Sequence, residues 1–245
     1  MPRIIVVLPA YNEAASLPAL LDRFASMPAT NDAPWEIVAV NDGSTDATGE
    51  ILDEAAKRFP LVQVRHERNR GLGPALITGL RTATGRAASA DDVIVCMDAD
   101  NTHDPKYIPE LARRIAAGAD MVICSRFQRG SRTVGVPLYR RLLSFGARMT
   151  FAVFLRLPGV RDYTCGYRAY RAALIRKGFE RWGEKLIERS GFACTDELLV
   201  RLAPLARRIE EIPFVLRYDQ KRSRSKLPLI RTIAATFRLL LQRQR

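Results

Sequence analysis

Short apolar runs alternate with helix-forming segments through the first 125 residues of the chain. Each run is rich in β-branched residues and is followed, after a few turn-forming residues, by a segment with helical character. Strands and helices that alternate at this spacing are typical of the α/β class, with a mostly parallel sheet covered by helices on both faces. The expected strands are Arg3–Leu8, Trp35–Val40, Leu61–His66, Val93–Met97 and Asp120–Cys124, and the helices end near Met27, Phe59, Leu80 and Ala117.

The alternation breaks after Cys124. We expect a Gly-rich basic loop at 125–136, an amphipathic helix at 137–157, a strand at 162–170, a helix at 195–205, a strand at 209–216, a charged loop at 218–226 and a basic amphipathic helix at 227–245. The two amphipathic helices could pack against the sheet or a second subunit, or lie in a lipid interface with arginines toward the headgroups. The chain is therefore divided into one domain, residues 1–226, with halves at 1–125 and 126–226, and a C-terminal helix.

Two carboxylates, Asp98 and Asp100, follow the apolar, β-branched run at 93–97. Side chains of a strand alternate with period two, so the two acids are expected to share one face. The carboxyl ends of strands in an open α/β sheet border the crevice in which ligands bind. Hard oxygen ligands at that place suit Mg²⁺ or Mn²⁺ bound together with substrate phosphates. The alternative is that both acids merely end a strand and cap a helix.

The composition narrows the class of partner. The formal net charge of +13 indicates anionic partners, which could be nucleic acid, anionic lipid or a phosphorylated substrate. The four cysteines are scattered and form no C-x-x-C pair, so we expect reduced thiols rather than a disulfide framework or a zinc site. No secretory signal is expected at the N-terminus, and no apolar run reaches the ~20 residues of a membrane span.

The motifs in their order resemble family 2 of the glycosyltransferases, which has the GT-A fold. Within that family the chain is most similar to the dolichyl-phosphate mannose synthases and the bacterial polyprenyl-phosphate glycosyltransferases. The motifs that carry the resemblance are Leu8–Glu13, Val40–Asp46, Asn69–Gly73 with Ala75 and Gly79, Asp98–Asp100 with His103 and Pro105, Ser125–Arg126, Gly166–Tyr170, and Arg217–Lys221 with Ser225 and Lys226. Together they cover nearly the whole chain.

The resemblance implies a site for a nucleoside-diphosphate sugar, linked to GDP or UDP, in the N-terminal half. Its residues would be Pro9, Ala10, Tyr11, Asn12, Glu13, Val40, Asp42, Asp98 and Ala99. The metal-binding motif of the family corresponds to Asp98 and Asp100, and Thr102 stands where some relatives carry a third ligand. His103 could be a ligand instead. Asn12 and Asp42, taken singly, could be only turn and cap residues.

The resemblance also implies an acceptor-phosphate site in the C-terminal half, formed by Ser125, Arg126, Arg140, Ser144, Arg217, Lys221 and Lys226. Arg140 and Ser144 are four residues apart and would share one helix face, although Arg141 could be the true contact. Arginine suits this role because its planar fork donates two bonds to a phosphate. Gly71 and Gly73 are expected to allow close backbone approach.

These features predict an inverting glycosyltransferase that moves a mannose- or glucose-type sugar to a polyprenyl phosphate, with Asp98, Asp100, Arg126 and Glu197 as catalytic residues. A phosphate nucleophile needs placement by cations more than a general base. Asp162 and Glu197 could therefore orient arginines or a sugar hydroxyl. A related enzyme acting on a soluble glycan or small-molecule hydroxyl would need Glu197 as base.

The expected location is the inner face of the cell membrane, in peripheral contact with anionic lipid, and a membrane-protein partner or homo-oligomer is possible. A nucleic-acid-binding protein is a further alternative raised by the charge. No zinc finger, recognition helix or aromatic RNA-binding signature supports it, so no nucleic acid is expected as a partner.

Overall fold

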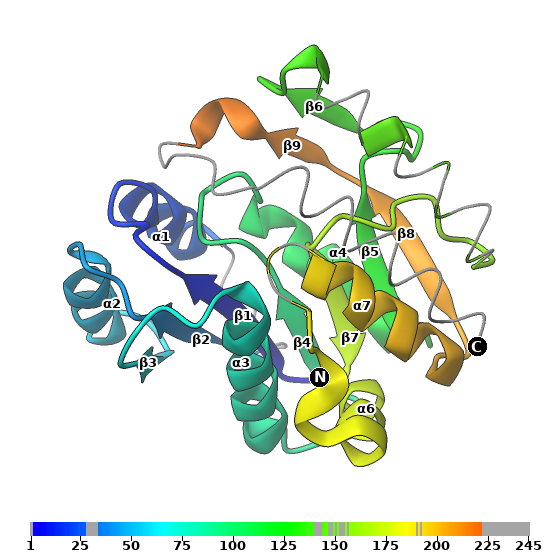
Figure 1. Ribbon diagram of the computed structural model, residues 1–245, viewed down its shortest axis with the longest axis horizontal. Helices are drawn as coiled ribbons and strands as arrows, with labels where there is room; N and C mark the ends of the chain where they lie inside the picture. The colour runs from blue at the N-terminus through cyan, green and yellow to red at the C-terminus, as the bar shows by residue number, and fades with distance from the viewer. Residues whose placement is uncertain are drawn as a thin grey trace.

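The protein is described here from a computed structural model, which covers residues 2–27, 34–139, 144–146, 149, 151, 155, 157–189, 191 and 193–221. A seven-stranded sheet in the order β3-β2-β1-β4-β7-β5-β8 forms its centre (Figure 1). All neighbouring strands pair in parallel except β7, which runs antiparallel to β4 and β5. The strands are β1 Ile4–Ala10, β2 Trp35–Asp42, β3 Leu61–His66, β4 Val93–Cys96, β5 Met121–Ser125, β7 Arg168–Arg171 and β8 Ile209–Pro213.

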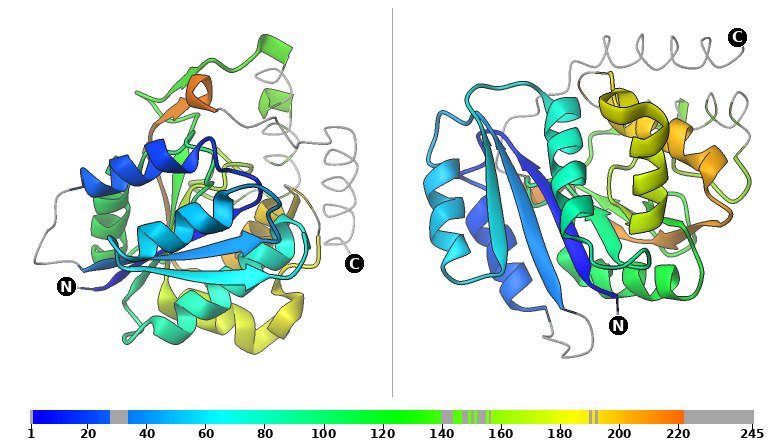
Figure 2. Two further views of the ribbon diagram at one scale, coloured as in Figure 1. Left: turned by 90° about the vertical axis from the view of Figure 1, so that its left-hand side faces the viewer. Right: turned by 90° about the horizontal axis from the view of Figure 1, so that it is seen from below.

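Helices cover both faces of this sheet (Figure 2). Helix α3 packs on β1 and β2 and contacts α6 and α7 on one face, whereas α1 contacts α2 and the short helix η1 that leads into α4 on the other. The helices are α1 Leu17–Ala25, α2 Thr48–Ala56, α3 Leu72–Arg86, α4 Ile108–Ala116, α6 Ala172–Trp182 and α7 Ala193–Leu202, with short 3₁₀ helices η1 Pro105–Tyr107, η2 Gly183–Leu186, η3 Ala203–Leu205 and η4 Tyr218–Gln220. The predicted α/β class with a mostly parallel sheet is confirmed.

The central strands are buried along their whole length. Every residue of β1 and of β4 is buried, as expected for strands that are covered on both faces and therefore read as continuous apolar runs. The helices are amphipathic instead, and α4 buries Ile108, Leu111, Ala112 and Ile115, which recur at helical spacing on one face. The periodicity of the sequence therefore separated strands from helices correctly in the first half of the chain.

The carboxyl ends of the parallel strands lie at one edge of the sheet. Ala10 at the end of β1 pairs with Asn41 of β2, and Asp42 pairs with His66 of β3. On the other side of β1, Val7 pairs with Cys96, the last residue of β4. The loops that follow β1, β2 and β4 are thus brought together, and these loops carry the predicted donor and metal residues.

The second half departs from the expected elements. The strand predicted at 162–170 begins only at Arg168, because the side chain of Asp162 accepts backbone N–H groups of Thr164 and Cys165 and holds that part in an irregular turn. Helix α6 was not predicted. The strand predicted at 209–216 is interrupted at Phe214, which is buried, and continues as β9, Val215–Arg217. Strand β9 pairs in parallel with β6, Arg132–Val134, inside the predicted loop.

The helix predicted at 227–245 lies outside the described residues, and so does part of the one predicted at 137–157, of which residues 138–139, 144–146, 149, 151 and 155 are helical. Within the described residues, no helix is long and apolar enough to span a membrane.

Candidate active site

The loop after β1 is tied to the loop after β2 by Asn12. Its side-chain oxygen accepts the backbone N–H of Thr45 at 2.8 Å, and its own N–H donates to the Ser44 hydroxyl at 3.1 Å. The backbone of Asn12 has φ +50°, a conformation that asparagine tolerates better than most residues. Both predicted nucleotide-binding loops are therefore held in one arrangement.

Asp42 is 3% exposed and has bonds to both of its oxygens. Oδ1 accepts the N–H of Arg70 at 3.0 Å and lies 2.6 Å from His66 Nδ1, while Oδ2 accepts the N–H of Gly71 at 2.8 Å. His66 Nε2 lies 2.9 Å from the hydroxyl of Thr78 on α3. His66 was not among the residues predicted for the site, although a histidine at the end of a predicted strand was an available signal. In the structure this group fixes the loop that enters α3.

The two glycines at that entrance are required for different reasons. A Cβ on Gly73 would lie 2.5 Å from the carbonyl oxygen of Arg189, so the expected close approach of backbone is confirmed there. A Cβ on Gly71 would meet nothing within 4 Å. Close approach is therefore wrong for Gly71, which is needed because its φ is +92°.

Asp98 and Asp100 follow β4 and are held by the turn around them. The N–H of Asp98 donates to His103 Nδ1 at 3.1 Å, and Asp100 Oδ1 accepts the N–H and the hydroxyl of Thr102 at 3.1 and 2.7 Å. Asn101, which lies between Asp100 and Thr102 in the sequence, takes the left-handed conformation with φ +64°. The other oxygen of Asp100 forms an ion pair with Nζ of Lys221.

The surroundings shift the pKa values of the two acids in opposite directions. Burial raises the pKa of Asp98, and the neighbouring Asp100 carboxylate adds to that increase. Burial acts in the same direction on Asp100, but Lys221, His103 and the Thr102 hydrogen bond together lower the pKa of Asp100 below its usual value. The pair thus holds negative charge at the crevice and already attracts one cation.

This donor set fits a divalent cation that is shared with a ligand. Among the described residues, no three His, Cys, Asp or Glu side chains are grouped so that they could hold a metal by themselves. Mg²⁺ is commonly held by one or two carboxylates together with substrate phosphates, and the ammonium group on Asp100 shows that a cation is accommodated there. The hydroxyl of Thr102 donates to Asp100, and His103 Nδ1 accepts from the backbone, so each has a partner within the turn.

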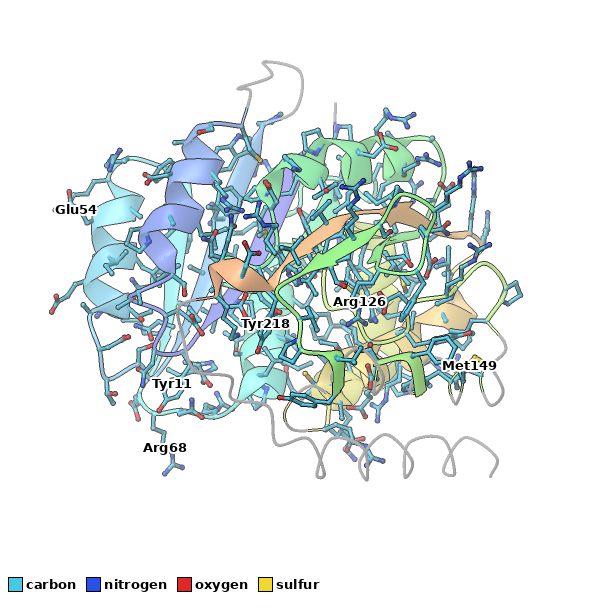
Figure 3. The ribbon with its side chains drawn as sticks, turned by 90° about the horizontal axis from the view of Figure 1, so that it is seen from above. Tyr11, Glu54, Arg68, Arg126, Met149 and Tyr218 are labelled. Atoms are coloured by element: carbon cyan, nitrogen blue, oxygen red, sulfur yellow. The ribbon has the colours of Figure 1, made fainter. Side chains whose placement is uncertain are left out.

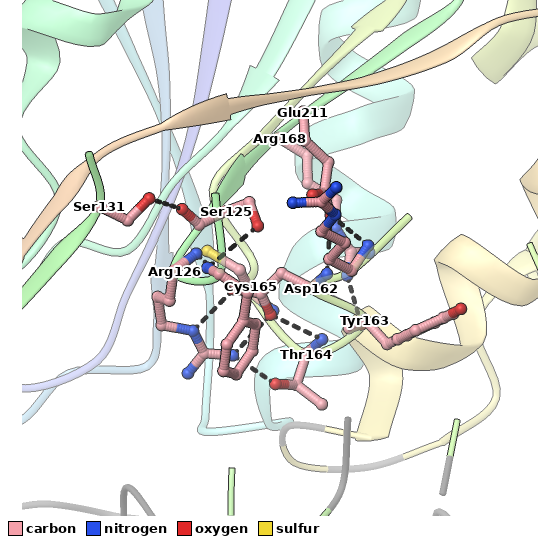
Figure 4. A network of polar contacts seen from close by, with 11 residues as sticks. Ser125, Arg126, Ser131, Asp162, Tyr163, Thr164, Cys165, Arg168 and Glu211 are labelled. Carbon is pink, nitrogen blue, oxygen red and sulfur yellow. Dashed lines mark hydrogen bonds and ion pairs between the residues drawn. The ribbon is translucent and has the colours of Figure 1, made fainter. Parts of the chain in front are cut away.

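Arg126 lies at the end of β5 and is held by Asp162 (Figure 4). Nε donates to Oδ2 at 2.8 Å, Nη2 donates to Oδ1 at 2.7 Å, and Nη2 also donates to the Thr164 hydroxyl at 2.5 Å. Asp162 is fully buried, which by itself would raise its pKa, but the guanidinium of Arg126 keeps the pKa of Asp162 below its usual value. The expectation that Asp162 orients an arginine fits this geometry. Among the described residues, Nη1 of Arg126 has no bonded partner.

The other predicted acceptor residues differ in burial and in their contacts. Ser125 is fully buried, and its hydroxyl accepts the N–H of Phe127 at 3.2 Å. Arg217 pairs with Asp219 at 2.8 Å, and Ser144 is half-buried. Arg140 and Lys226 lie outside the described residues. In the view from above, Tyr218 on η4 is seen between Tyr11 and Arg126 (Figure 3).

Glu197 is 2% exposed and accepts bonds on both oxygens. Oε2 accepts the N–H groups of Glu188 and Arg189 at 2.8 Å each, and Oε1 pairs with Arg201 at 2.8 Å. In this position Glu197 fixes the loop whose carbonyl lies over Gly73. A catalytic role for Glu197 remains a prediction.

Arg168 on β7 is a further residue that the sequence analysis assigned no role. Its guanidinium is fully buried and donates from Nη1 to the carbonyl of Thr195 at 2.7 Å and from Nη2 to the carbonyl of Tyr163 at 2.6 Å. It therefore ties the start of α7 to the turn that contains Asp162. Its place within the Gly166–Tyr170 motif was the available signal.

Comparison with known proteins gives one family and several relatives. The model of "Glycosyl transferase family 2" matches residues 5–179. The chain is 35% identical over 212 residues to an undecaprenyl-phosphate mannosyltransferase of Micrococcus luteus, covering 86% of this chain and 82% of the relative. It is 32% identical to a dolichol-phosphate mannosyltransferase of Pyrococcus furiosus, covering 86% of this chain and 56% of that longer protein.

Among solved structures, the fold is similar to that of glucosyl-3-phosphoglycerate synthase from Mycobacterium tuberculosis, crystallised with Mn²⁺, uridine diphosphate and glucosyl-3-phosphoglycerate. The TM-score is 0.65 at 23% identity, and the alignment covers 99% of this chain and 80% of that one. At this identity the likeness concerns the fold.

Proposed function

The chain belongs to glycosyltransferase family 2, and from that premise we propose that it transfers a mannose- or glucose-type sugar from a nucleoside-diphosphate donor to a polyprenyl phosphate, with inversion at the sugar. The names of the relatives from Micrococcus luteus and Pyrococcus furiosus support the lipid-phosphate acceptor. The Mn²⁺ and uridine diphosphate in the M. tuberculosis structure support a divalent cation and a nucleotide donor.

The observation that carries the proposal is the pair of acids and the oriented arginine at one edge of the sheet. Arg168 of β7 pairs with Cys96 of β4 on one side and with Ile123 of β5 on the other. Asp98 and Arg126 come two and three residues after these partners, so they lie at nearly the same height along the strand direction. Strands two positions apart are separated by about 10 Å. A diphosphate at Asp98 and a phosphate at Arg126 would therefore lie on opposite sides of one bound sugar.

Asp98 and Asp100 would hold Mg²⁺ or Mn²⁺, which when bound neutralises the charge of the departing diphosphate. The loop from Pro9 to Glu13, together with Val40, Asp42 and Ala99, would surround the nucleotide. Arg126 would hold the acceptor phosphate, assisted by Arg217 and Lys221 and by the other predicted acceptor residues, Ser125, Arg140, Ser144 and Lys226.

The acceptor phosphate can act without a general base. A phosphate monoester has a second pKa near ~6 and is largely dianionic at neutral pH. It needs to be positioned and its charge compensated, and Arg126, which Asp162 holds in place, can provide both. The burial of Glu197 and the bonds to both of its oxygens are consistent with that mechanism.

We also propose that the protein works at the surface of a membrane, in the cytoplasm and on the inner face. Several large apolar side chains are exposed on one stretch of the chain, including Leu138 at 67%, Tyr139 at 55%, Phe145 at 52% and Met149 at 50%. The net charge of +13 favours contact with anionic lipid. A polyprenyl phosphate would be reached from this side.

The test is incubation of the protein with radiolabelled GDP-mannose or UDP-glucose, a short polyprenyl phosphate, and Mn²⁺ or Mg²⁺. We expect label to enter the organic phase with one donor and to remain aqueous when the lipid or the metal is omitted. Label transferred only to a soluble glycan or phosphorylated small molecule would replace the proposed acceptor. Tight RNA binding without any transfer would contradict the proposal as a whole.

A further inference from the structure

The ammonium group of Lys221 occupies the cation position of the acid pair. It contacts Asp100 directly, and the side chains of both residues are nearly buried, at 13% and 12% exposure. Burial by itself would lower the pKa of Lys221, but Asp100 above all, and then Asp98 and Glu13, raise the pKa of this lysine above its usual value. Lys221 is thus paired with Asp100 and is also attracted by two further acids in the loops after β1 and β4.

Hydrogen bonds donated by backbone N–H groups fix the segment that carries Lys221 next to the turn that contains Asp98 and Asp100. The N–H of Val215 donates to the hydroxyl of Tyr107 at 2.9 Å, and the N–H of Arg217 donates to the carbonyl of Thr102, next to the acids, at 3.1 Å. The segment then turns through η4, where the N–H of Lys221 donates to the carbonyl of Tyr218 at 3.2 Å and Gln220 bonds Arg23 of α1. Lys221 therefore belongs to a strap, residues 215–221, that crosses the D-x-D turn.

Two cations cannot share this place without strong repulsion in a nearly buried setting. A divalent ion bound by Asp98 and Asp100 would compete with the ammonium group for the same carboxylate oxygen. We propose that Lys221 is the built-in counter-ion of the acid pair, and that a divalent cation binds there only by displacing Lys221, which then becomes available to an anionic phosphate. This inference rests on the metal-dependent function proposed above.

The exchange links metal binding to donor binding. Without a donor, the displaced ammonium group loses its carboxylate partners, so the metal binds weakly. With a nucleoside diphosphate, the phosphates give both the metal and Lys221 new anionic partners, and each ligand strengthens the binding of the other by the same factor. The strap would accordingly change its position when the crevice is filled.

The first experiment measures the affinity of Mn²⁺ for the protein without nucleotide, by electron paramagnetic resonance of the free ion. Lys221→Met keeps the length of the side chain and removes its charge. We expect this variant to bind Mn²⁺ at least about tenfold more tightly, the ratio expected when the lysine fills the site for more than about nine-tenths of the time. Addition of GDP or UDP should reduce the difference.

The matched control is Lys106→Met. Lys106 pairs with Asp104 at 3.4 Å on η1, close in sequence to the acids, but its side chain is 62% exposed. The Lys106→Met substitution removes the same charge but leaves Lys221 on Asp100, so the Mn²⁺ affinity of this variant should stay near that of the unmodified protein. Equal affinity in the unmodified protein and Lys221→Met, or an equal increase in both variants, would overturn the exchange.

The second experiment uses the unmodified protein and so does not depend on the folding of a variant. Lysines are labelled briefly with an amine-reactive ester, and the peptides are quantified by mass spectrometry with and without Mn²⁺. Lys221 should be protected without the metal and labelled several-fold faster with it, while Lys106 reacts equally in both. Protection that persists at saturating Mn²⁺ would contradict displacement.

The two proposals fail in different ways. If Mn²⁺ binds to neither the unmodified protein nor Lys221→Met, and Asp100→Asn changes nothing, the metal-dependent function itself is wrong. If Mn²⁺ binding requires Asp100 but is indifferent to Lys221, the function stands and only the exchange is refuted.

Discussion

At the scale of single residues, the site is defined by charged groups that are fixed before any ligand arrives. Arg126 is the clearest example, because Asp162 and Thr164 bond two of its nitrogens. An arginine held in this way loses little conformational freedom when it binds a phosphate, and preorganised charge is an effective means of catalysis. Two predictions follow from this pair.

Arg126→Lys should lower turnover by about 10²–10³-fold while the KM for the nucleotide sugar changes little. Lysine keeps the charge next to Asp162 but lacks the planar fork that reaches both the carboxylate and a phosphate. The measurement is steady-state kinetics with the donor and acceptor varied separately. Arg129→Lys, an exposed arginine three residues along the same loop, is the control and should leave both parameters unchanged.

Asp162→Asn should reduce the free energy of unfolding by about 3 kcal/mol at neutral pH, because it leaves the mostly buried guanidinium of Arg126, whose side chain is 16% exposed, without its counter-ion. The pKa of Asp162 is lower in the folded protein than its ordinary value of 3.8. Its contribution is therefore complete above pH ~4 and is lost as the pH falls through the lower, folded value. Urea unfolding of both proteins between pH 7 and pH 3 should show the difference narrowing only at the acid end. A difference that is independent of pH would contradict the ion pair.

At the scale of elements, close packing of one loop on α3 shapes the entrance to the crevice. Glu197 of α7 accepts two backbone N–H groups of the loop, and the carbonyl of Arg189 from that loop lies over Gly73. The contact joins the two halves of the chain. It depends on a glycine at one position and on a side-chain oxygen at the other that accepts both N–H groups.

Gly73→Ala should destabilise the protein by about 1–3 kcal/mol, because its Cβ would lie 2.5 Å from a backbone oxygen that cannot move independently. Gly85, on the same helix, has open space around its Cβ position. Gly85→Ala should therefore stabilise the protein by about 0.5–1 kcal/mol through helix propensity. Chemical denaturation of the two variants checks the opposite signs, and a similar effect of both substitutions would disprove the close approach.

Glu197→Gln separates the two kinds of acceptor. If Glu197 only fixes the loop, an amide of the same shape should keep the fold, and transfer to a lipid phosphate should fall by less than about tenfold. Loss of a general base would instead lower turnover by about 10²–10⁴-fold. Measurement of kcat from pH 5 to 9 distinguishes these outcomes, and a loss of the second kind would indicate a hydroxyl acceptor.

At the scale of the whole molecule, charge and exposed apolar surface act together. The net charge of +13 attracts the protein to anionic surfaces, and the exposed side chains around Leu138 and Phe145 offer apolar contact there. We expect the protein to sediment with vesicles that contain phosphatidylglycerol and to be released by salt, since screening weakens the attraction.

The double variant Leu138→Gln with Phe145→Gln should weaken vesicle binding at fixed salt while leaving transfer to a short, water-soluble polyprenyl phosphate intact. If the double variant binds vesicles as tightly as the unmodified protein does, this surface does not contact lipid. The control is vesicles of neutral lipid, which should bind the unmodified protein weakly.

Much of the fold could be predicted from the sequence, because the signal was local. Strands β1, β4 and nearly all of β5 are continuous apolar runs, and the acids at 98 and 100 follow directly after β4. The second half was predicted less well for a physical reason. Its boundaries depend on long-range partners, such as Asp162, whose bonds to Arg126 and to nearby N–H groups prevent the strand from starting before Arg168.

The sequence alone determined the class of fold, the family and the identity of the charged residues at the crevice, because periodicity and motif order are properties of the chain itself. Only the tertiary structure decided which charges meet: Arg126 with Asp162, Glu197 with the loop over Gly73, and Lys221 with Asp100 across 121 positions of sequence. The reason is that an ion pair depends on distance in space, and the distance between residues so far apart in the chain is set by the packing of the whole sheet.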